Sequence, residues 1–63
     1  MKFNKQELTD KAEEFIRAFY DDLPFYLTKV DEEGQRVEFL ADGYHSYLHF
    51  KADGYTLWGN LPS

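Results

Sequence analysis

"ADGYHSYLHFKADGY" (residues 41–55) decides the fold, because the same four residues, ADGY, stand at both of its ends. An Asp-Gly pair between alternating apolar and polar runs is typical of a two-residue type I′ hairpin turn, which needs positive φ at both positions. Turns are therefore predicted at 42–43 and 53–54, with one strand between them. We interpret the repeat as the consequence of two hairpins that share this strand, with duplication of a hairpin unit as the alternative.

Three further segments have the aromatic and β-branched composition of strands. They are FYLTKV (25–30), QRVEFLA (35–41) and YTLWG (55–59), which accompany YHSYLHFK (44–51). The connector DEEG (31–34) fits a type I turn followed by a glycine bulge. Four strands joined by three tight turns predict an antiparallel β-meander.

The turns also predict which residues face each other across the strands. The expected cross-strand pairs are Leu27–Phe39, Thr28–Glu38, Phe39–Ser46, Val37–Leu48, Phe50–Leu57 and His49–Trp58. All three registers place one apolar set on a single face: Leu27, Val37, Phe39, Leu48, Phe50 and Leu57. A slip of one residue at any turn would scatter this set, so the agreement among the turns is the main support for the fold.

Residues 4–22 are predicted to form an amphipathic helix. Its apolar residues recur three or four positions apart and form one stripe: Leu8, Ala12, Phe15, Ile16, Phe19 and Leu23. Asn4 and Glu7 have the spacing of a capping box, and Pro24 ends the helix because the residue before a proline avoids helical conformation. The chain is therefore expected to be one α+β domain over 1–63, with this helix packed on one face of the meander.

The other face of the predicted sheet has no element left to cover it. It is expected to carry Tyr26, Thr28, Arg36, Glu38, Leu40, His45, Tyr47, His49, Lys51, Thr56 and Trp58. Because Tyr, Trp and Arg are enriched at interfaces, the predicted partner-binding residues are Tyr26, Arg36, Leu40, His45, Tyr47, His49 and Trp58. The alternative is that these aromatic residues only stabilise a small sheet, at roughly 0.2–1 kcal/mol per cross-strand pair.

Composition narrows the class of function. The 63 residues include no cysteine, are 19% aromatic and carry a formal net charge of −5. No disulfide or thiolate metal site is therefore available, and the negative charge disfavours binding to phosphates. The sequence shows neither a signal-peptide pattern nor an apolar run of membrane-spanning length, so a cytoplasmic location without membrane contact is expected.

The sequence contains no catalytic or metal-binding motif. His45 and His49 lie on one predicted strand with their Cα atoms about 13 Å apart, too far for one zinc ion. Either histidine, with Glu38 and Tyr47, has the chemistry for proton transfer, but a flat sheet face offers no pocket that excludes water. No enzyme activity, metal ion or cofactor is therefore expected.

The leading hypothesis is a small, acidic, non-catalytic interaction domain of regulator or inhibitor type. Its open aromatic sheet face would mediate homodimerisation or bind a protein partner. The alternative is a single-stranded nucleic-acid-binding domain that stacks bases on the same face, as other small sheets do.

Overall fold

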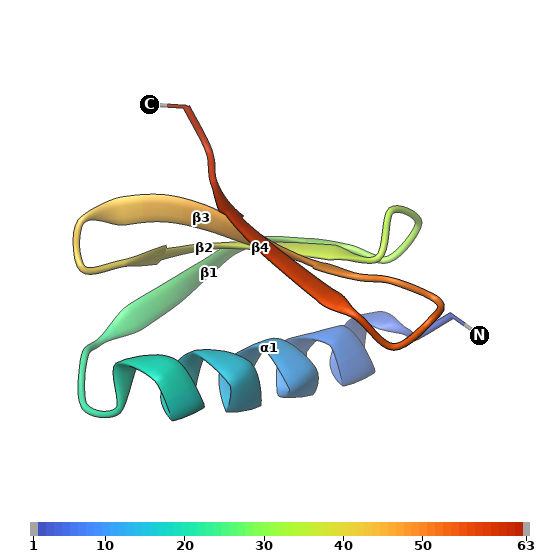
Figure 1. Ribbon diagram of the computed structural model, residues 1–63, viewed down its shortest axis with the longest axis horizontal. Coiled ribbons are helices and arrows are strands. Elements are labelled where there is room, and N and C mark those ends of the chain that lie inside the picture. The colour runs from blue at the N-terminus through green and yellow to red at the C-terminus, as the bar shows by residue number, and fades with distance from the viewer. Residues whose placement is uncertain (1, 63) are drawn as a thin grey trace.

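A helix and a four-stranded antiparallel sheet form two layers in the computed structural model, which describes residues 2–62 (Figure 1). The elements, in chain order, are α1 (Lys5–Tyr20), β1 (Phe25–Asp31), β2 (Arg36–Ala41), β3 (Tyr44–Phe50) and β4 (Thr56–Asn60). Strands that follow each other in the chain are neighbours in the sheet, so β1 and β4 are its two edges. The predicted α+β architecture, one helix followed by a meander, is confirmed.

Helix α1 begins as the sequence predicts and ends slightly earlier. The Glu7 amide donates to Asn4 Oδ1 (2.8 Å) and the Asn4 amide donates to Glu7 Oε1 (3.0 Å), which completes the capping box. The helix was expected to run to residue 22, but it ends at Tyr20 because Asp21 takes a positive φ of 48°. The amide of Asp21 still donates to the Arg17 carbonyl at 2.9 Å, which closes the last turn.

The core lies between α1 and the face of the sheet that it covers. Its buried apolar residues are Leu8, Ala12 and Ile16 from the helix and Val37, Phe39, Ala41, Leu48 and Phe50 from the two central strands. Full burial of a large apolar side chain contributes about 1.5–3 kcal/mol. The predicted helix-facing placement of Val37, Phe39, Leu48 and Phe50 is confirmed, and Leu27 packs half-buried against the same cluster.

The first ADGY segment forms the predicted hairpin turn between β2 and β3. Asp42 (φ 54°) and Gly43 (φ 79°) both lie in the left-handed region, as a type I′ turn requires. The register pairs Val37 with Leu48, as predicted, and runs without interruption along both strands.

The second ADGY segment folds differently, and the register predicted for β4 is wrong by one residue. Here only Gly54 has a positive φ (95°), and its amide donates to the Lys51 carbonyl at 3.0 Å. The Lys51 amide donates to the Tyr55 carbonyl at 2.8 Å, so Ala52, Asp53 and Gly54 make a three-residue loop instead of a two-residue turn. This geometry is the type I turn with a left-handed third residue that three-residue hairpin loops adopt.

The shifted register exchanges the positions of two apolar side chains. Trp58 was predicted on the open face but faces the helix, where its ring centroid lies 5.9 Å from Phe15 and 4.3 Å from Phe19. Leu57 was predicted on the helix face but is 46% exposed on the other side. The large indole ring gains more from burial and edge-to-face contacts than leucine would, so it selects this register.

The hairpin between β1 and β2 contains a bulge that the sequence did not reveal. Leu27 pairs with Phe39 as predicted, but Lys29 replaces Thr28 opposite Glu38 because the register shifts between Leu27 and Lys29. The expected glycine bulge at the following turn is also wrong, since its left-handed residue is Gln35 (φ 54°).

The side chains around this turn explain its geometry. The Gln35 side chain accepts from the Phe3 amide at 2.8 Å and donates to the Phe3 carbonyl at 2.9 Å, which ties the turn to the start of the chain. A Cβ at Gly34 would lie 2.6 Å from Asp31 Oδ2, so a larger residue would displace the carboxylate that accepts from the Gly34 amide at 3.1 Å.

Candidate protein-interaction surfaces

The face of the sheet opposite α1 is uncovered, and it carries every predicted site residue except Trp58. Residues on this face alternate with the buried residues of β2 and β3. Arg36 lies opposite His49, and Leu40 lies between Tyr26 on one side and His45 on the other. The predicted assembly of Tyr26, Arg36, Leu40, His45, Tyr47 and His49 on one face is therefore confirmed, although their binding role stays a prediction.

Tyr47 is occupied by contacts within the domain. The Arg36 guanidinium lies 4.5 Å from the centre of the Tyr47 ring, a cation–π geometry. The same ring covers the backbone of Gly59 on β4, where an added Cβ would lie only 2.7 Å from ring atoms. Tyr47 on β3 therefore contacts both β2 and β4. These contacts make its ring less available to a ligand than the sequence pattern predicts.

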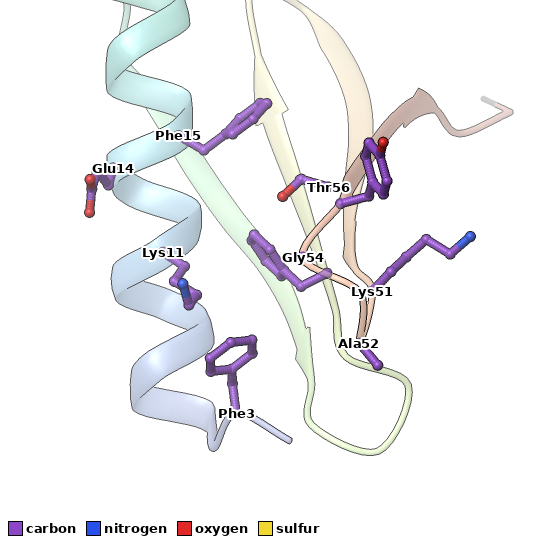
Figure 2. A pocket seen from close by; sticks show the side chains of 10 residues that line it. Phe3, Lys11, Glu14, Phe15, Lys51, Ala52, Gly54 and Thr56 are labelled. Carbon is purple, nitrogen blue, oxygen red and sulfur yellow. The ribbon is translucent and has the colours of Figure 1, made fainter. Parts of the chain in front are cut away.

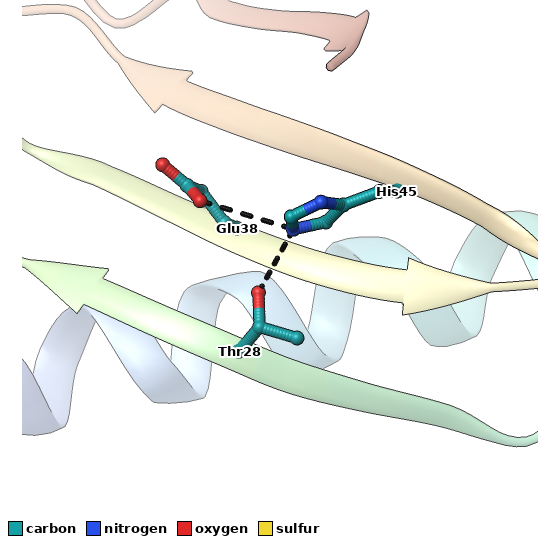
Figure 3. Close-up of polar contacts among 3 residues, drawn as sticks. All are labelled: Thr28, Glu38 and His45. Atoms are coloured by element: carbon teal, nitrogen blue, oxygen red, sulfur yellow. Dashed lines mark hydrogen bonds and ion pairs between the residues drawn. The ribbon is translucent and has the colours of Figure 1, made fainter. Parts of the chain in front are cut away.

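Thr28, Glu38 and His45 form a polar cluster across β1, β2 and β3 (Figure 3). His45 Nε2 lies 3.1 Å from Thr28 Oγ1 and 3.8 Å from Glu38 Oε1. A nucleophile–histidine–carboxylate relay needs the carboxylate at the other ring nitrogen, so that the histidine can pass a proton between its two partners. Because both contacts here reach the same nitrogen, the cluster joins three strands and does not form a relay.

At one end of the open face, two exposed apolar side chains lie next to each other. Tyr26 is 70% exposed, Leu40 is 41% exposed, and the two face each other across β1 and β2. Together with Leu23 they line a shallow hollow of about 410 Å³ that ends at the 42–43 turn. We call these three residues the Tyr26 patch.

A second exposed apolar surface lies between α1 and β4, where the sequence did not predict one. Phe19, Tyr20, Tyr44 and Trp58 line a hollow of about 390 Å³ that extends to Asn60, and we call it the Asn60 hollow. Phe19 remains 63% exposed although its ring packs edge-to-face on Trp58. The signal in the sequence was the Phe15–Phe19 spacing, which places two aromatic rings on the same flank of the helix.

Another hollow lies between α1 and the β3–β4 hairpin, nearer the start of the helix. This hollow of about 350 Å³, the Thr56 hollow, has Phe3 and Phe15 on one side and Thr56 on the other, and its lining also includes Phe50 and Tyr55 (Figure 2). It exists because α1 packs closest to β1 and β2, which leaves the β3–β4 hairpin partly uncovered on the helix side.

Few acidic side chains of the domain take part in ion pairs. Within residues 2–62 the only ion-pair contact is the one between His45 and Glu38, at 3.8 Å. Three of the seven basic residues instead lie over aromatic rings: besides Arg36 on Tyr47, Lys11 is 4.5 Å from the Phe3 ring centre and Arg17 is 5.1 Å from that of Phe25. The net charge of −5 is therefore available to attract a positively charged partner.

Comparison of the chain with models of protein families, with curated proteins and with solved structures finds no match. Within the described chain no helix has both the length and the apolar composition to cross a membrane. The same residues contain no group of three or more His, Cys, Asp or Glu side chains arranged to hold a metal ion.

Proposed function

We propose that this protein is a small, acidic, non-catalytic interaction domain that binds a partner protein through the Tyr26 patch. The observation that carries the proposal is the exposure of Leu23, Tyr26 and Leu40 side by side, at a face that no element within residues 2–62 covers. Clustered exposed apolar residues of this kind mark contact surfaces, and tyrosine is among the residues that dominate binding energy at interfaces.

The partner is a different protein in this proposal, and not a second copy. Two copies would each bring a net charge of −5 to the interface, and this like-charge repulsion opposes association. A partner with positive charge around an apolar surface is favoured by the same field. A cytoplasmic location remains part of the proposal.

A catalytic role is not proposed because the polar groups of the open face hold one another in place. His45 joins Thr28 and Glu38 without forming a relay, and Arg36 lies on Tyr47. The hollow beside Tyr26 is shallow and mainly apolar, so it lacks the converging polar groups that an enzyme site uses.

Binding of single-stranded nucleic acid has less support than it had from the sequence. With Trp58 on the helix side and Tyr47 between Arg36 and Gly59, two of the three aromatic rings predicted on the open face are not free to stack on bases. Stacking of successive bases needs several such rings beside a basic groove.

A photo-crosslinking residue at position 26 tests the proposal. In an extract of the cells that produce the protein, we expect the probe to link one partner that is larger than a second copy of the chain. We expect Leu40→Ser to abolish the link, because it removes the apolar neighbour of the probe.

The matched control carries the same probe at Tyr55, which is 71% exposed but lies outside the patch. Equal labelling from both positions would refute a specific site at Tyr26. A link only between two copies of the chain would replace the proposed partner with a homodimer.

A further inference from the structure

The outer edge of β4 has free backbone hydrogen-bonding groups. At the two ends of the β3–β4 pairing, the Lys51 amide donates to Tyr55 and the Leu61 amide donates to His45. Because hydrogen-bonded and non-bonded pairs alternate along an antiparallel ladder, the intervening bonded residues of β4 are 57 and 59. The N–H and C=O groups of Thr56, Trp58 and Asn60 therefore point away from β3, toward solvent.

The two edges of the sheet differ in how they are protected from another strand. Edge strands of native proteins usually carry a bulge, a lysine or a proline that blocks further pairing. The outer strand β1 has both a register shift at Thr28 and the exposed Lys29. By contrast β4, with the sequence TLWGN, has no charged residue, proline or register shift.

The helix side of β4 has two hollows, both lined in part by aromatic side chains, at a spacing that suits an extended strand. The Thr56 hollow and the Asn60 hollow, of about 350 and 390 Å³, lie on either side of Trp58. Thr56 and Asn60 are four residues apart along the strand, which is about 13 Å. Since every second side chain of a strand faces the same way, an added strand would direct its residues i and i+4 toward these two hollows.

The charges near the two hollows indicate the sign of the charge that a partner should carry. Asp21 and Asp22 follow directly after Tyr20 of the Asn60 hollow, whereas the Thr56 hollow is lined by Lys11 and Lys51 as well as Glu14. Asp21 and Asp22 are exposed, and neither forms an ion pair within the described residues. The acidic end beside the Asn60 hollow and the net charge of −5 favour a segment that carries Lys or Arg, and disfavour a second acidic copy of the chain.

We propose that β4 accepts an extended, positively charged segment of a partner protein as a fifth strand of the sheet. The segment places apolar side chains at positions i and i+4 into the Asn60 and Thr56 hollows, and its backbone pairs with Thr56, Trp58 and Asn60. Main-chain hydrogen bonds then supply affinity and the two hollows supply specificity, as in other complexes formed by strand addition. The proposal goes beyond the interaction at the Tyr26 patch, because it uses a separate surface.

A synthetic peptide of nine residues tests this directly. It carries two leucines four positions apart, threonine midway between them and lysines at the outward-facing positions. We expect it to shift the amide resonances of Thr56, Trp58 and Asn60 and to slow their hydrogen exchange. Binding should weaken by about tenfold or more between low and high salt, because the attraction is screened.

Three controls separate the parts of the proposal. Methylation of the peptide amides that pair with β4 should weaken binding by about tenfold or more, without any change in the protein. Glutamate in place of the lysines should abolish binding, as should serine in place of the leucines. Thr56→Pro should block pairing while Thr56→Val does not, since proline is tolerated at the first position of an edge strand but cannot donate.

The outcomes distinguish this proposal from the function proposed above. No binding at millimolar peptide, or equal binding of the acidic peptide, would overturn the strand-addition proposal and leave the Tyr26 patch unaffected. Shifts confined to Tyr26 and Leu40 would also overturn it, while they support the other surface. A free protein that is already dimeric, with the three β4 amides protected, would assign the edge to a second copy instead.

Discussion

Replacement of Trp58 by alanine should destabilise the domain far more than replacement of its neighbour Leu57. The Trp58 ring makes edge-to-face contacts with Phe15, Phe19 and Tyr20, with centroid distances of 5.9, 4.3 and 5.8 Å. Truncation of a core aromatic residue to alanine costs about 3–5 kcal/mol, and the half-buried position of Trp58 places it near the lower value. A 63-residue domain is stable by only roughly 3–9 kcal/mol in total, so Trp58→Ala should remove between about a third and all of that free energy of unfolding.

The matched variant Leu57→Ala removes an exposed side chain and should change the free energy of unfolding by less than about 0.5 kcal/mol. Urea unfolding followed by far-ultraviolet circular dichroism measures both, because Trp58 is the single tryptophan and its loss removes the fluorescence signal. A loss of 3 kcal/mol corresponds to a fall in Tm of roughly 12–24 °C in a domain of this size. If Leu57→Ala were the more damaging change, β4 would have the opposite register and the reasoning on both faces of the strand would be refuted.

Three further predictions use the same unfolding assay. Gly59→Ala should cost about 1–3 kcal/mol, because the new Cβ displaces the Tyr47 ring; an unchanged Tm would mean that the ring does not cover this backbone. Asn4→Ala should cost about 1 kcal/mol through loss of the helix cap, and a neutral result would contradict the capping role. Ala52→Pro should be neutral or stabilising by about 0.4–1 kcal/mol, because Ala52 is the second residue of a type I turn; clear destabilisation would indicate the two-residue turn instead.

Local sequence was sufficient to predict the structure of those segments for which only one conformation satisfies the preferences of the residues. The capping box at Asn4 and Glu7 and the type I′ turn at 42–43 were predictable because each depends on residues a few positions apart. Two residues of the Tyr26 patch were also within reach, since the pairing of Tyr26 with Leu40 lies on the regular side of the β1 bulge. These features require no knowledge of how the helix lies on the sheet. The third residue of the patch, Leu23, was predicted on the apolar stripe of the helix but lies beyond its end.

The second turn was not predictable from its own four residues, because Asp-Gly fits two loops. A two-residue turn holds both residues in the left-handed region, whereas the three-residue loop needs it only at Gly54. The Asp53 carboxylate accepts from the Tyr55 amide at 3.1 Å, which supports the longer loop. The choice depends on distant residues, since only this register brings Trp58 to Phe15 and Phe19 on the helix.

The same choice determines which parts of β4 are open to a partner. By turning Trp58 toward the helix, the three-residue loop leaves apolar space on both sides of the indole and turns Leu57 outward. In the opposite register Leu57 would lie in the cleft and the indole on the open face, so the two hollows would not be separated by an aromatic ring. The surface proposed for strand addition is therefore a consequence of tertiary packing, and the local sequence of β4 does not determine it.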